Sequence, residues 1–383
     1  MYNLKIKKIT ETELTNEGSF LQTPFWCEFK AAHGWKYERF EIVVEMPESL
    51  EGEKIIDKTL ETSVLTRSFA KGLFTLAYVP LFPSFVYDTE EDQTVEFAHL
   101  MADIGNALKS FLPKNCICIR FDPDVEFLTP EDRDDFNFGM KMVCFADKLK
   151  IRKNRVDIQP PDTTQINLIP DETEILGKMK SKWRYNVNLA VKKGVEIEKI
   201  NGNSSDLQEK LEIFYNLYKI TAERDGIAIH PKSYYEDLIV RSAKLIAEGK
   251  DVPEVNLYLA KHEEDYLGAI ITLFSKTESI YLYGCSSNVK RNLMPNFLLQ
   301  WTAMKDAKAY GSLYYDMYGM PPTDDEKHPM HGLYLFKTGF GGQNIHRIGS
   351  WDFHLKGIYR LCIFVENIRA WWHKKVMKKI RHR

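Results

Sequence analysis

The order of predicted helices and strands occurs twice along the chain, and this repetition restricts the possible folds more than any other feature. In the first half a helix, two strands, a helix and a buried strand are predicted at 25–34, 38–45, 63–79, 92–112 and 115–121. In the second half a helix, three strands, a helix and a strand are predicted at 206–224, 255–262, 266–275, 279–284, 295–310 and 312–318. The repetition predicts two α+β units of one topology with mixed sheets.

The length of the chain agrees with two units, because 383 residues exceed one ordinary hydrophobic core. The stretch NRVDIQPPDTTQINL, residues 154–168, places two prolines before a new predicted strand. Prolines in this position are typical of a junction between domains. We therefore expect the chain to pass from the first unit to the second near this stretch.

The bulk composition is that of a globular protein, with 44% hydrophobic and 28% charged residues. The first 20 residues have no apolar run after their lysines, so no signal peptide is expected, and no window is apolar enough to cross a bilayer. The six cysteines are scattered and fit neither a disulfide framework nor a metal site. A cytoplasmic protein with reduced thiols, no metal and no cofactor is expected.

The C-terminal 29 residues are strongly basic. Residues 355–383 contain nine lysines and arginines against one acid, Glu366, although the net charge of the whole chain is −2. Apolar side chains recur there every three or four residues, which predicts an amphipathic helix, at Ile358, Leu361, Val365, Ile368, Trp372, Val376 and Ile380. Such a helix suits three roles: peripheral contact with an anionic membrane, contact with tRNA, or docking of its apolar stripe on the first unit.

The repeated order of elements resembles the acyltransferase fold of the GNAT type. A member that uses acetyl-CoA should present a Gly-rich pyrophosphate loop between the central hairpin and the following helix. At these positions the chain reads VPLFPSFVYDTEED, residues 79–92, and GCSSNVKRNLMPN, residues 284–296. Neither stretch offers such a loop, which disfavours acetyl-CoA as the donor.

Five stretches together resemble the FemABX family of non-ribosomal peptidyltransferases. They are FLQTPFWCEFKAAHGW (20–35), SKWRYNVNLAVKKGVEI (181–197), TAERDGIAIH (221–230), YLYGCSSNVKRNLMPNFLLQWTAMKDAKAYG (281–311) and HPMHGLYLFKTGFGG (328–342). The family transfers an amino acid from aminoacyl-tRNA to an amine in the stem peptide of a peptidoglycan precursor. The resemblance implies two GNAT-like lobes with the acceptor in the groove between them.

The resemblance also implies that the C-terminal strands return to the first lobe. We therefore expect a first lobe of residues 1–162 with 349–383, and a second lobe of residues 163–348. Some members carry a coiled-coil arm in the second lobe, but no long heptad pattern occurs between residues 198 and 255. The chain thus resembles the shorter, armless type.

Lys337 is the first candidate catalytic residue. The family's lysine in its Phe-Lys pair is implicated near the reacting centre, and here the pair is Phe336 and Lys337. Attack of an amine on an aminoacyl ester builds negative charge on the carbonyl oxygen, which a fixed cation stabilises. Gly339, Gly341 and Gly342 would let the tRNA 3′ end or the backbone approach closely. The alternative is a hairpin turn with a solvated lysine.

Residues for the acceptor are carried over from the same motifs. Lys30 matches a family lysine that contacts the phosphate-bearing part of the acceptor, and Trp26 lies one turn before it. Arg224 in the RDG pattern also suits phosphate, although pairing with an acid such as Asp225 is the competing use. Tyr283 and Tyr78 complete the set, with a role as core aromatics as the alternative.

Cations interleaved with aromatics suggest a tRNA contact in the second lobe. The candidates are Lys180, Lys182, Arg184, Lys192 and Lys193, with Trp183 and Tyr185 among them. A solvated helix face is the alternative. Asp316, His328 and His331 fit no metal-ligand pattern well, so we prefer loop capping by Asp316 and a structural His331.

The predicted function is transfer of an amino acid from aminoacyl-tRNA to the side-chain amine of residue three of UDP-MurNAc-pentapeptide or lipid II. One departure concerns the acceptor: relatives often have Arg-Gly-Pro after YVP, whereas Leu81 and Phe82 stand here. Two alternatives are a GNAT-type N-acyltransferase with an acyl-CoA or acyl-carrier donor, and a non-catalytic adaptor that binds tRNA or membrane.

Overall fold

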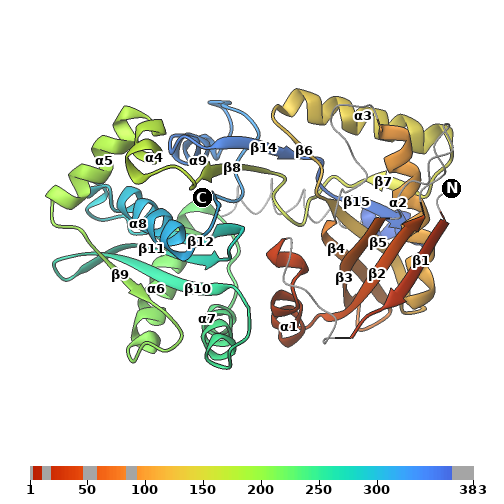
Figure 1. The fold of residues 1–383 in the computed structure, drawn as a ribbon, viewed down its shortest axis with the longest axis horizontal. Coiled ribbons are helices and arrows are strands. Elements are labelled where there is room, and N and C mark those ends of the chain that lie inside the picture. The colour runs from red at the N-terminus through yellow and green to blue at the C-terminus, as the bar shows by residue number, and fades with distance from the viewer. Residues whose placement is uncertain (1–2, 11–18, 46–57, 83–92, 365–383) are drawn as a thin grey trace. The chain divides into compact units, whose positions relative to one another are not determined.

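The chain divides into two compact units, shown as ribbons in Figure 1. The computed structural model describes residues 3–10, 19–45, 58–82 and 93–364. The first unit comprises Met1–Pro161 and His346–Arg383, and the second comprises Asp162–Ile345. The predicted boundaries, after residues 162 and 348, lie close to these positions.

The first unit contains a seven-stranded mixed sheet in the order β1-β2-β3-β4-β5-β15-β7. Its strands are β1 (Asn3–Lys8), β2 (Lys36–Glu45), β3 (Lys58–Phe69), β4 (Phe74–Phe82), β5 (Cys116–Pro123), β7 (Ile151–Lys153) and β15 (Trp351–His354). A short strand β6 (Glu126–Phe127) also lies in this unit. Its helices are α1 (Pro24–Ala32), α2 (Thr94–Leu108) and α3 (Pro130–Ala146). Only the pair of β4 and β5 is parallel.

The second unit is built around strands in the order β14-β8-β13-β12-β11-β10-β9. These are β8 (Asp162–Asn167), β9 (Glu196–Ile200), β10 (Glu254–His262), β11 (Asp265–Phe274), β12 (Glu278–Ser286), β13 (Tyr314–Asp316) and β14 (Gln343–Arg347), the last of which ends in the first unit. The helices are α4 (Glu172–Lys178), α5 (Ser181–Lys192), α6 (Leu207–Asp225), α7 (Lys232–Ala247), α8 (Pro295–Tyr310) and α9 (His331–Thr338). Here β12 and β13 form the parallel pair.

The predicted duplication is confirmed. In each unit three antiparallel strands are followed by a helix and a parallel strand, first as β2-β3-β4-α2-β5 and then as β10-β11-β12-α8-β13. A parallel neighbour requires a crossover, and α2 and α8 supply it. Residues 198–255 hold the two separate helices α6 and α7 and no coiled-coil arm. The fold is therefore α+β with two GNAT-like halves, as the sequence predicts.

The predicted secondary structure differs from the observed one around residues 63–82 and at two helices. The single strand at 63–79 is two strands, because Ala70, Lys71 and Gly72 adopt positive φ and turn the chain. Pro80 does not end β4, since it stands at an irregularity where the pairing with β5 shifts register and no regular ladder bond is required. Helices α3 and α7 are not predicted from the sequence, although Thr129 caps α3 and Pro130 opens it.

A buried ion pair fixes the return of the chain into the first unit. Arg120 on β5 and Asp352 on β15 lie opposite each other in the strand register. The guanidinium meets the carboxylate at two points, with Nε–Oδ1 at 2.7 Å and Nη2–Oδ2 at 2.9 Å. Asn154 and the hydroxyl of Tyr359 also donate to Asp352, at 3.0 and 2.9 Å. One carboxylate thus joins β5, β15 and the start of the C-terminal segment.

The C-terminal helix begins differently from the prediction. Residues 359–364 are helical, and Tyr359 is buried against Ile117 and Cys118. Ile358 and Leu361, which open the predicted apolar stripe, are 40% and 60% exposed. The first turn therefore docks through another face, and residues 365–383 lie outside the described residues. No helix in the described part of the chain is long and apolar enough to cross a bilayer.

Replacing Asp352 by asparagine keeps the shape of the side chain but leaves the buried Arg120 without its counter-charge. We expect Asp352→Asn to lower the free energy of unfolding by about 3–5 kcal/mol, measured by urea denaturation followed by tryptophan fluorescence. The matched control is Asp134→Asn at an exposed pair with Arg133, which should change it by no more than about 0.5 kcal/mol. Similar small effects in both variants would contradict the assigned role of the pair.

Candidate functional site

Lys337 lies in the last turn of helix α9, not in a hairpin turn. Its side chain is buried, with 5% of the residue exposed. The ammonium donates to the carbonyl oxygens of Met317, Tyr318 and Gly319 at 2.7, 2.8 and 2.8 Å. It also lies 5.1 Å from the ring centre of Tyr281. The alternative of a solvated lysine in a hairpin is therefore wrong.

The electrostatics of Lys337 are those of a buried cation held by backbone dipoles. Burial lowers the pKa of Lys337 to about 7, and the charge of Asp316 acts in the opposite direction. Three carbonyl oxygens also favour the protonated form. An ammonium has three N–H donors, so all of them are used within the protein in this arrangement. A substrate would therefore experience the charge of Lys337, or the loop that it holds, rather than a donated hydrogen bond.

The loop at 317–319 is also held by Asp316, as the preferred prediction states. Asp316 is 3% exposed, and its carboxylate accepts from the backbone N–H of Tyr318 at 2.6 Å and from the hydroxyl of Thr163. His331 lies at the start of α9 with its Nδ1 3.1 Å from Asp324. Among the described residues no cluster of three or more histidines, cysteines or acids is suited to a metal ion.

The three glycines after Lys337 admit other parts of the protein. A Cβ on Gly339 would lie 2.2 Å from the ring of Trp183. A Cβ on Gly341 would lie 2.3 Å from the carbonyl oxygen of Lys178, and φ is +81° there. The indole of Trp183 donates to the carbonyl of Phe336 at 2.8 Å. This close packing fastens α5 to the end of α9 and occupies part of the half-buried indole of Trp183.

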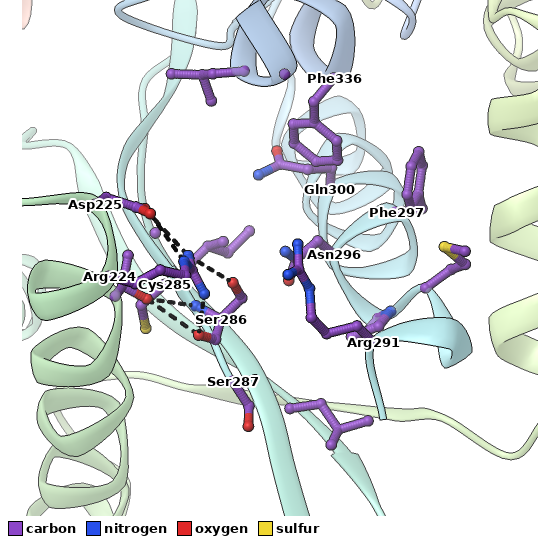
Figure 2. A pocket seen from close by; sticks show the side chains of 18 of the residues that line it. Arg224, Asp225, Cys285, Ser286, Ser287, Arg291, Asn296, Phe297, Gln300 and Phe336 are labelled. Atoms are coloured by element: carbon purple, nitrogen blue, oxygen red, sulfur yellow. Dashed lines mark hydrogen bonds and ion pairs between the residues drawn. The ribbon is translucent and has the colours of Figure 1, made fainter. Parts of the chain in front are cut away.

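A pocket of about 430 Å³ opens beside α9 within the second unit. Figure 2 shows its wall, formed by the end of α6, the end of β12, the start of α8 and one face of α9. Two predicted residues, Arg224 and Phe336, line it, and so does Tyr281, whose ring lies against Lys337. The stretch 284–297 contributes more of the wall than any other. This is the position where a pyrophosphate loop is expected in an acetyl-CoA enzyme.

The pocket carries more positive than negative charge. Arg224 pairs with Asp225, with Nε–Oδ1 at 2.9 Å and Nη2–Oδ2 at 3.2 Å, and also donates to Ser286. The alternative considered for Arg224, pairing with Asp225, is therefore observed, and the pair lies on the wall of the pocket. Arg291 is exposed and lies four residues before the start of α8 at Pro295, and the N-terminus of α8 has no side-chain cap. The pocket wall therefore has two guanidiniums and a helix N-terminus but one carboxylate. This balance of charge suits a ligand with an anionic group.

Tyr283 is not among the residues that line the pocket. Its ring packs edge-on against Tyr235 with the centroids 5.1 Å apart. Burial raises the pKa of Tyr283 well above its ordinary value. The structure therefore gathers Arg224 and Phe336 at the pocket but places Tyr283 in an aromatic cluster behind it.

The predicted acceptor residues of the first unit gather around Trp35. Lys30 lies 5.8 Å from the ring centre of Trp26 and 5.7 Å from that of Trp35, and the ring centre of Tyr78 is 6.2 Å from that of Trp35. Arg67 also lies over the ring of Trp35, with its guanidinium carbon 5.5 Å from the ring centre. Burial and then the charge of Arg67 lower the pKa of Lys30 to about 8. Sequence reasoning missed Trp35 and Arg67, although Trp35 directly follows the Gly34 that ends the helix motif.

The five proposed tRNA contacts divide into two kinds. Lys180, Lys182, Lys192 and Lys193 are exposed on or beside α5, where Tyr185 is 63% exposed. Arg184 instead donates to the carbonyl oxygens of Gly177 and Met179 and so completes the end of α4. The exposed lysines remain candidates for tRNA, whereas the contacts of Arg184 are structural.

Two mixed sheets of one topology, each with a parallel pair made by a crossover helix, define a tandem protein of the acyltransferase fold. The FemAB family model matches residues 11–245 and 241–366, and the chain belongs to that family. The chain is 25% identical to the lipid II:glycine glycyltransferases of Staphylococcus epidermidis, over 95% of both chains, and of Staphylococcus aureus, over 96% of this chain and 95% of the relative. The crystal structure of FemX is 23% identical with a TM-score of 0.68, and the match covers 94% of this chain and 100% of that one.

These findings confirm the predicted family and the predicted enzyme class, an aminoacyltransferase. The alignment with the Staphylococcus epidermidis relative is 424 positions long, which exceeds the 383 residues of this chain. The relative therefore has segments with no counterpart here.

The packing of Trp183 on Gly339 leads to a test with two substitutions in one segment. We expect Gly339→Ala to lower the free energy of unfolding by about 1–3 kcal/mol, because the new methyl group overlaps the indole. Gly332 lies in the first turn of α9, whereas Gly339 follows its last residue, and a Cβ on Gly332 meets nothing within 4 Å. Gly332→Ala should therefore be neutral or stabilising by up to about 1 kcal/mol. Thermal unfolding of both variants measures the difference. Equal stability of the two would show that α5 does not pack on α9 as described.

Proposed function

We propose that this protein transfers an amino acid from aminoacyl-tRNA to the side-chain amine of residue three in a peptidoglycan precursor. The observation that carries the proposal is the match to the lipid II:glycine glycyltransferases over 95% of both chains. A match of that extent includes both units, the segment of Lys30 and the segment of Lys337. Glycine is therefore the first amino acid to test, and lipid II and UDP-MurNAc-pentapeptide are the two acceptors.

The proposed chemistry is attack of a neutral amine on an activated ester. The attack places negative charge on the carbonyl oxygen and then on the leaving ribose oxygen. The charge of Lys337 is buried and held rigidly by three carbonyls, so its field acts in a region of low dielectric constant. No histidine or carboxylate of the matched motifs is assigned as a base, and a substrate phosphate or water would take the proton.

The acceptor's phosphates are proposed to bind the cluster of Lys30, Trp26, Tyr78, Trp35 and Arg67. Two cations beside Trp35 suit a diphosphate, which both proposed acceptors contain. Relatives often have an arginine at the position of Leu81 on β4. Here Arg67, on the neighbouring strand β3, supplies a cation instead. A lipid-linked acceptor would bring the enzyme to the inner face of the membrane, where the basic segment 365–383 suits anionic headgroups.

A second candidate function is N-acyl transfer from an acyl-CoA or acyl-carrier donor. The position of the 430 Å³ pocket favours it, because the pocket lies where an acetyl-CoA enzyme of this fold would bind its coenzyme, whereas the lack of a Gly-rich loop at 284–297 disfavours it. Thermal-shift measurements with coenzyme A and, separately, with UDP-MurNAc-pentapeptide distinguish the two candidates by which ligand raises the Tm. A non-catalytic adaptor for tRNA or membrane is the third possibility.

The decisive experiment supplies the purified protein with glycyl-tRNA carrying labelled glycine and with either acceptor. The proposal expects labelled glycine on the stem peptide, located by mass spectrometry at the side chain of residue three. Failure with both acceptors and with a panel of charged tRNAs would contradict the proposal and leave the adaptor. Transfer from acyl-CoA instead would support the second candidate.

Lys337→Met should lower turnover far more than acceptor binding, by about 100-fold to 1,000-fold, because a stabilising charge at the reacting centre contributes a few kcal/mol. The control is Lys276→Met at an exposed lysine in the turn between β11 and β12, which should leave turnover unchanged. Thermal unfolding and acceptor affinity show whether the Lys337 variant is still folded. Equal losses in turnover and acceptor binding would make Lys337 a binding residue.

Acceptor binding should depend on pH through Lys30. Its pKa is lowered to about 8, so the ammonium is present below that pH and is lost as the pH rises through it. We expect the Kd for UDP-MurNAc-pentapeptide to rise about tenfold between pH 7 and pH 9. Lys30→Arg keeps the charge throughout this range and should remove most of that dependence. An unchanged pH profile in Lys30→Arg would exclude Lys30 as the titrating phosphate contact.

A further inference from the structure

Gln300 carries a polar group in the pocket that has no hydrogen-bond partner in the described part of the chain. It lies on α8, and only 1% of the residue is exposed. Its Oε1 accepts a hydrogen bond from the hydroxyl of Tyr315 at 2.9 Å, and Tyr315 is itself completely buried. Within the described residues its amide nitrogen donates to no other group. The carboxamide points into the pocket beside Phe336 (Figure 2).

The bond from Tyr315 determines which end of this amide faces the pocket. A hydroxyl that donates to Oε1 turns the NH₂ group of Gln300 away from the core and toward the cavity. The NH₂ group is not enclosed by protein atoms, and a ligand that filled the cavity without accepting its hydrogen bond would leave the donor unsatisfied, at a cost of about 1–3 kcal/mol. The surrounding sequence FLLQWTAM is otherwise apolar, apart from one threonine. A lone glutamine in that run is therefore best explained by a ligand that accepts its hydrogen bond.

The remaining polar groups of the pocket indicate what kind of ligand this is. Arg291 and the uncapped N-terminus of α8 are donors or positive ends, and Met294 at that N-terminus has φ of +56°. Asp225 is the only acid on the wall, and Arg224 already binds it at two points. Asn296 also lines the pocket, and its buried Oδ1 is an acceptor without a partner among the described residues. The other polar side chains named here supply mainly donors and positive charge, which suit a ligand that presents phosphoryl and carbonyl oxygens.

We propose that Gln300 is a specificity-determining residue for the donor, and that its amide nitrogen donates a hydrogen bond to an oxygen of the aminoacylated 3′-terminal nucleotide. This inference rests on the proposed function. The nucleotide's phosphate lies at Arg291 and the start of α8, and its base has the rings of Phe297 and Phe336 to contact. Tyr315 acts through Gln300, as a positioning residue that keeps the NH₂ group turned to the ligand.

The experiment uses 3′-glycylamino-3′-deoxyadenosine 5′-monophosphate, a hydrolysis-resistant analogue of the charged 3′ end, in calorimetric titrations of the full chain. Loss of one hydrogen bond in Gln300→Met should weaken its binding about tenfold. Gln300→Glu should weaken it further, because a carboxylate presents no donor to the phosphoryl and carbonyl oxygens. Tyr315→Phe frees the amide to rotate and should weaken binding by a smaller factor. In the double variant with Gln300→Met the Tyr315→Phe effect should disappear.

Two controls separate a role in binding from a role in folding. Gln208→Met makes the same substitution on α6, where Gln208 is exposed and bonded to Glu236, and it should bind the analogue as the wild type does. Affinity for UDP-MurNAc-pentapeptide should stay unchanged in every variant. If Gln300→Met unfolds on heating before titration is feasible, Gln300→Glu and Tyr315→Phe provide the same comparison.

The inference is overturned if the wild type binds the analogue and Gln300→Met binds it equally well. It is also overturned if coenzyme A binds in a Gln300-dependent way while the analogue does not, since the pocket would then be a coenzyme site. Both results are distinct from failure of the proposed function, which is decided by transfer from glycyl-tRNA in the wild type. If the wild type transfers glycine and Gln300→Met has the same KM for the donor, the proposed function stands and the proposed role of Gln300 is wrong.

Discussion

The pocket of the second unit depends on the hydrogen bonds of the buried Lys337 ammonium. A buried charge is retained only when its surroundings satisfy it, and here three successive carbonyls of the 317–319 loop do so. The bonds connect helix α9 to the chain that leaves β13. Because α9 supplies Phe336 to the pocket wall, the same cation that ties the loop also fixes that wall. The aromatic and glycine residues around it serve the same packing, through Trp183 on Gly339.

Much of the fold follows from local signals in the sequence. The bounds of α8 agree with the prediction because Pro295 has the φ that a helix start requires and Gly311 adopts the left-handed conformation that ends it. The helix at Lys337 could not be read in this way, because a glycine-rich and aromatic segment carries no capping signal. The acceptors of Lys337 lie about 20 residues earlier in the chain, and no pattern of charges indicates backbone carbonyls. For Gln300 the only signal was its isolation in an apolar helix.

The stretch 284–296 shows how a GNAT-like half can lack the phosphate loop and still form a pocket there. Positive φ occurs at Lys290 and Met294, where glycine is the ordinary choice. The stretch lacks the run of glycines whose backbone N–H groups form a pyrophosphate cradle. Recognition at this position then depends on side chains such as Arg291 and Gln300 together with the N-terminus of α8. That difference argues against a coenzyme bound in the usual manner of the fold.

Several groups predicted to face substrate use their polar atoms within the protein instead. The hydroxyl of Tyr78 donates its hydrogen bond to the buried Asp122 at 2.5 Å. Tyr78 therefore has no hydroxyl proton to donate to the acceptor substrate, and its ring lies beside Trp35. Burial raises the pKa of Asp122, and the hydrogen bond from Tyr78 acts in the opposite direction. Lys337 follows the same principle with its three carbonyls. Polar residue type in a motif therefore identifies the neighbourhood of a site, whereas the partner of each polar atom decides which groups remain for the substrate.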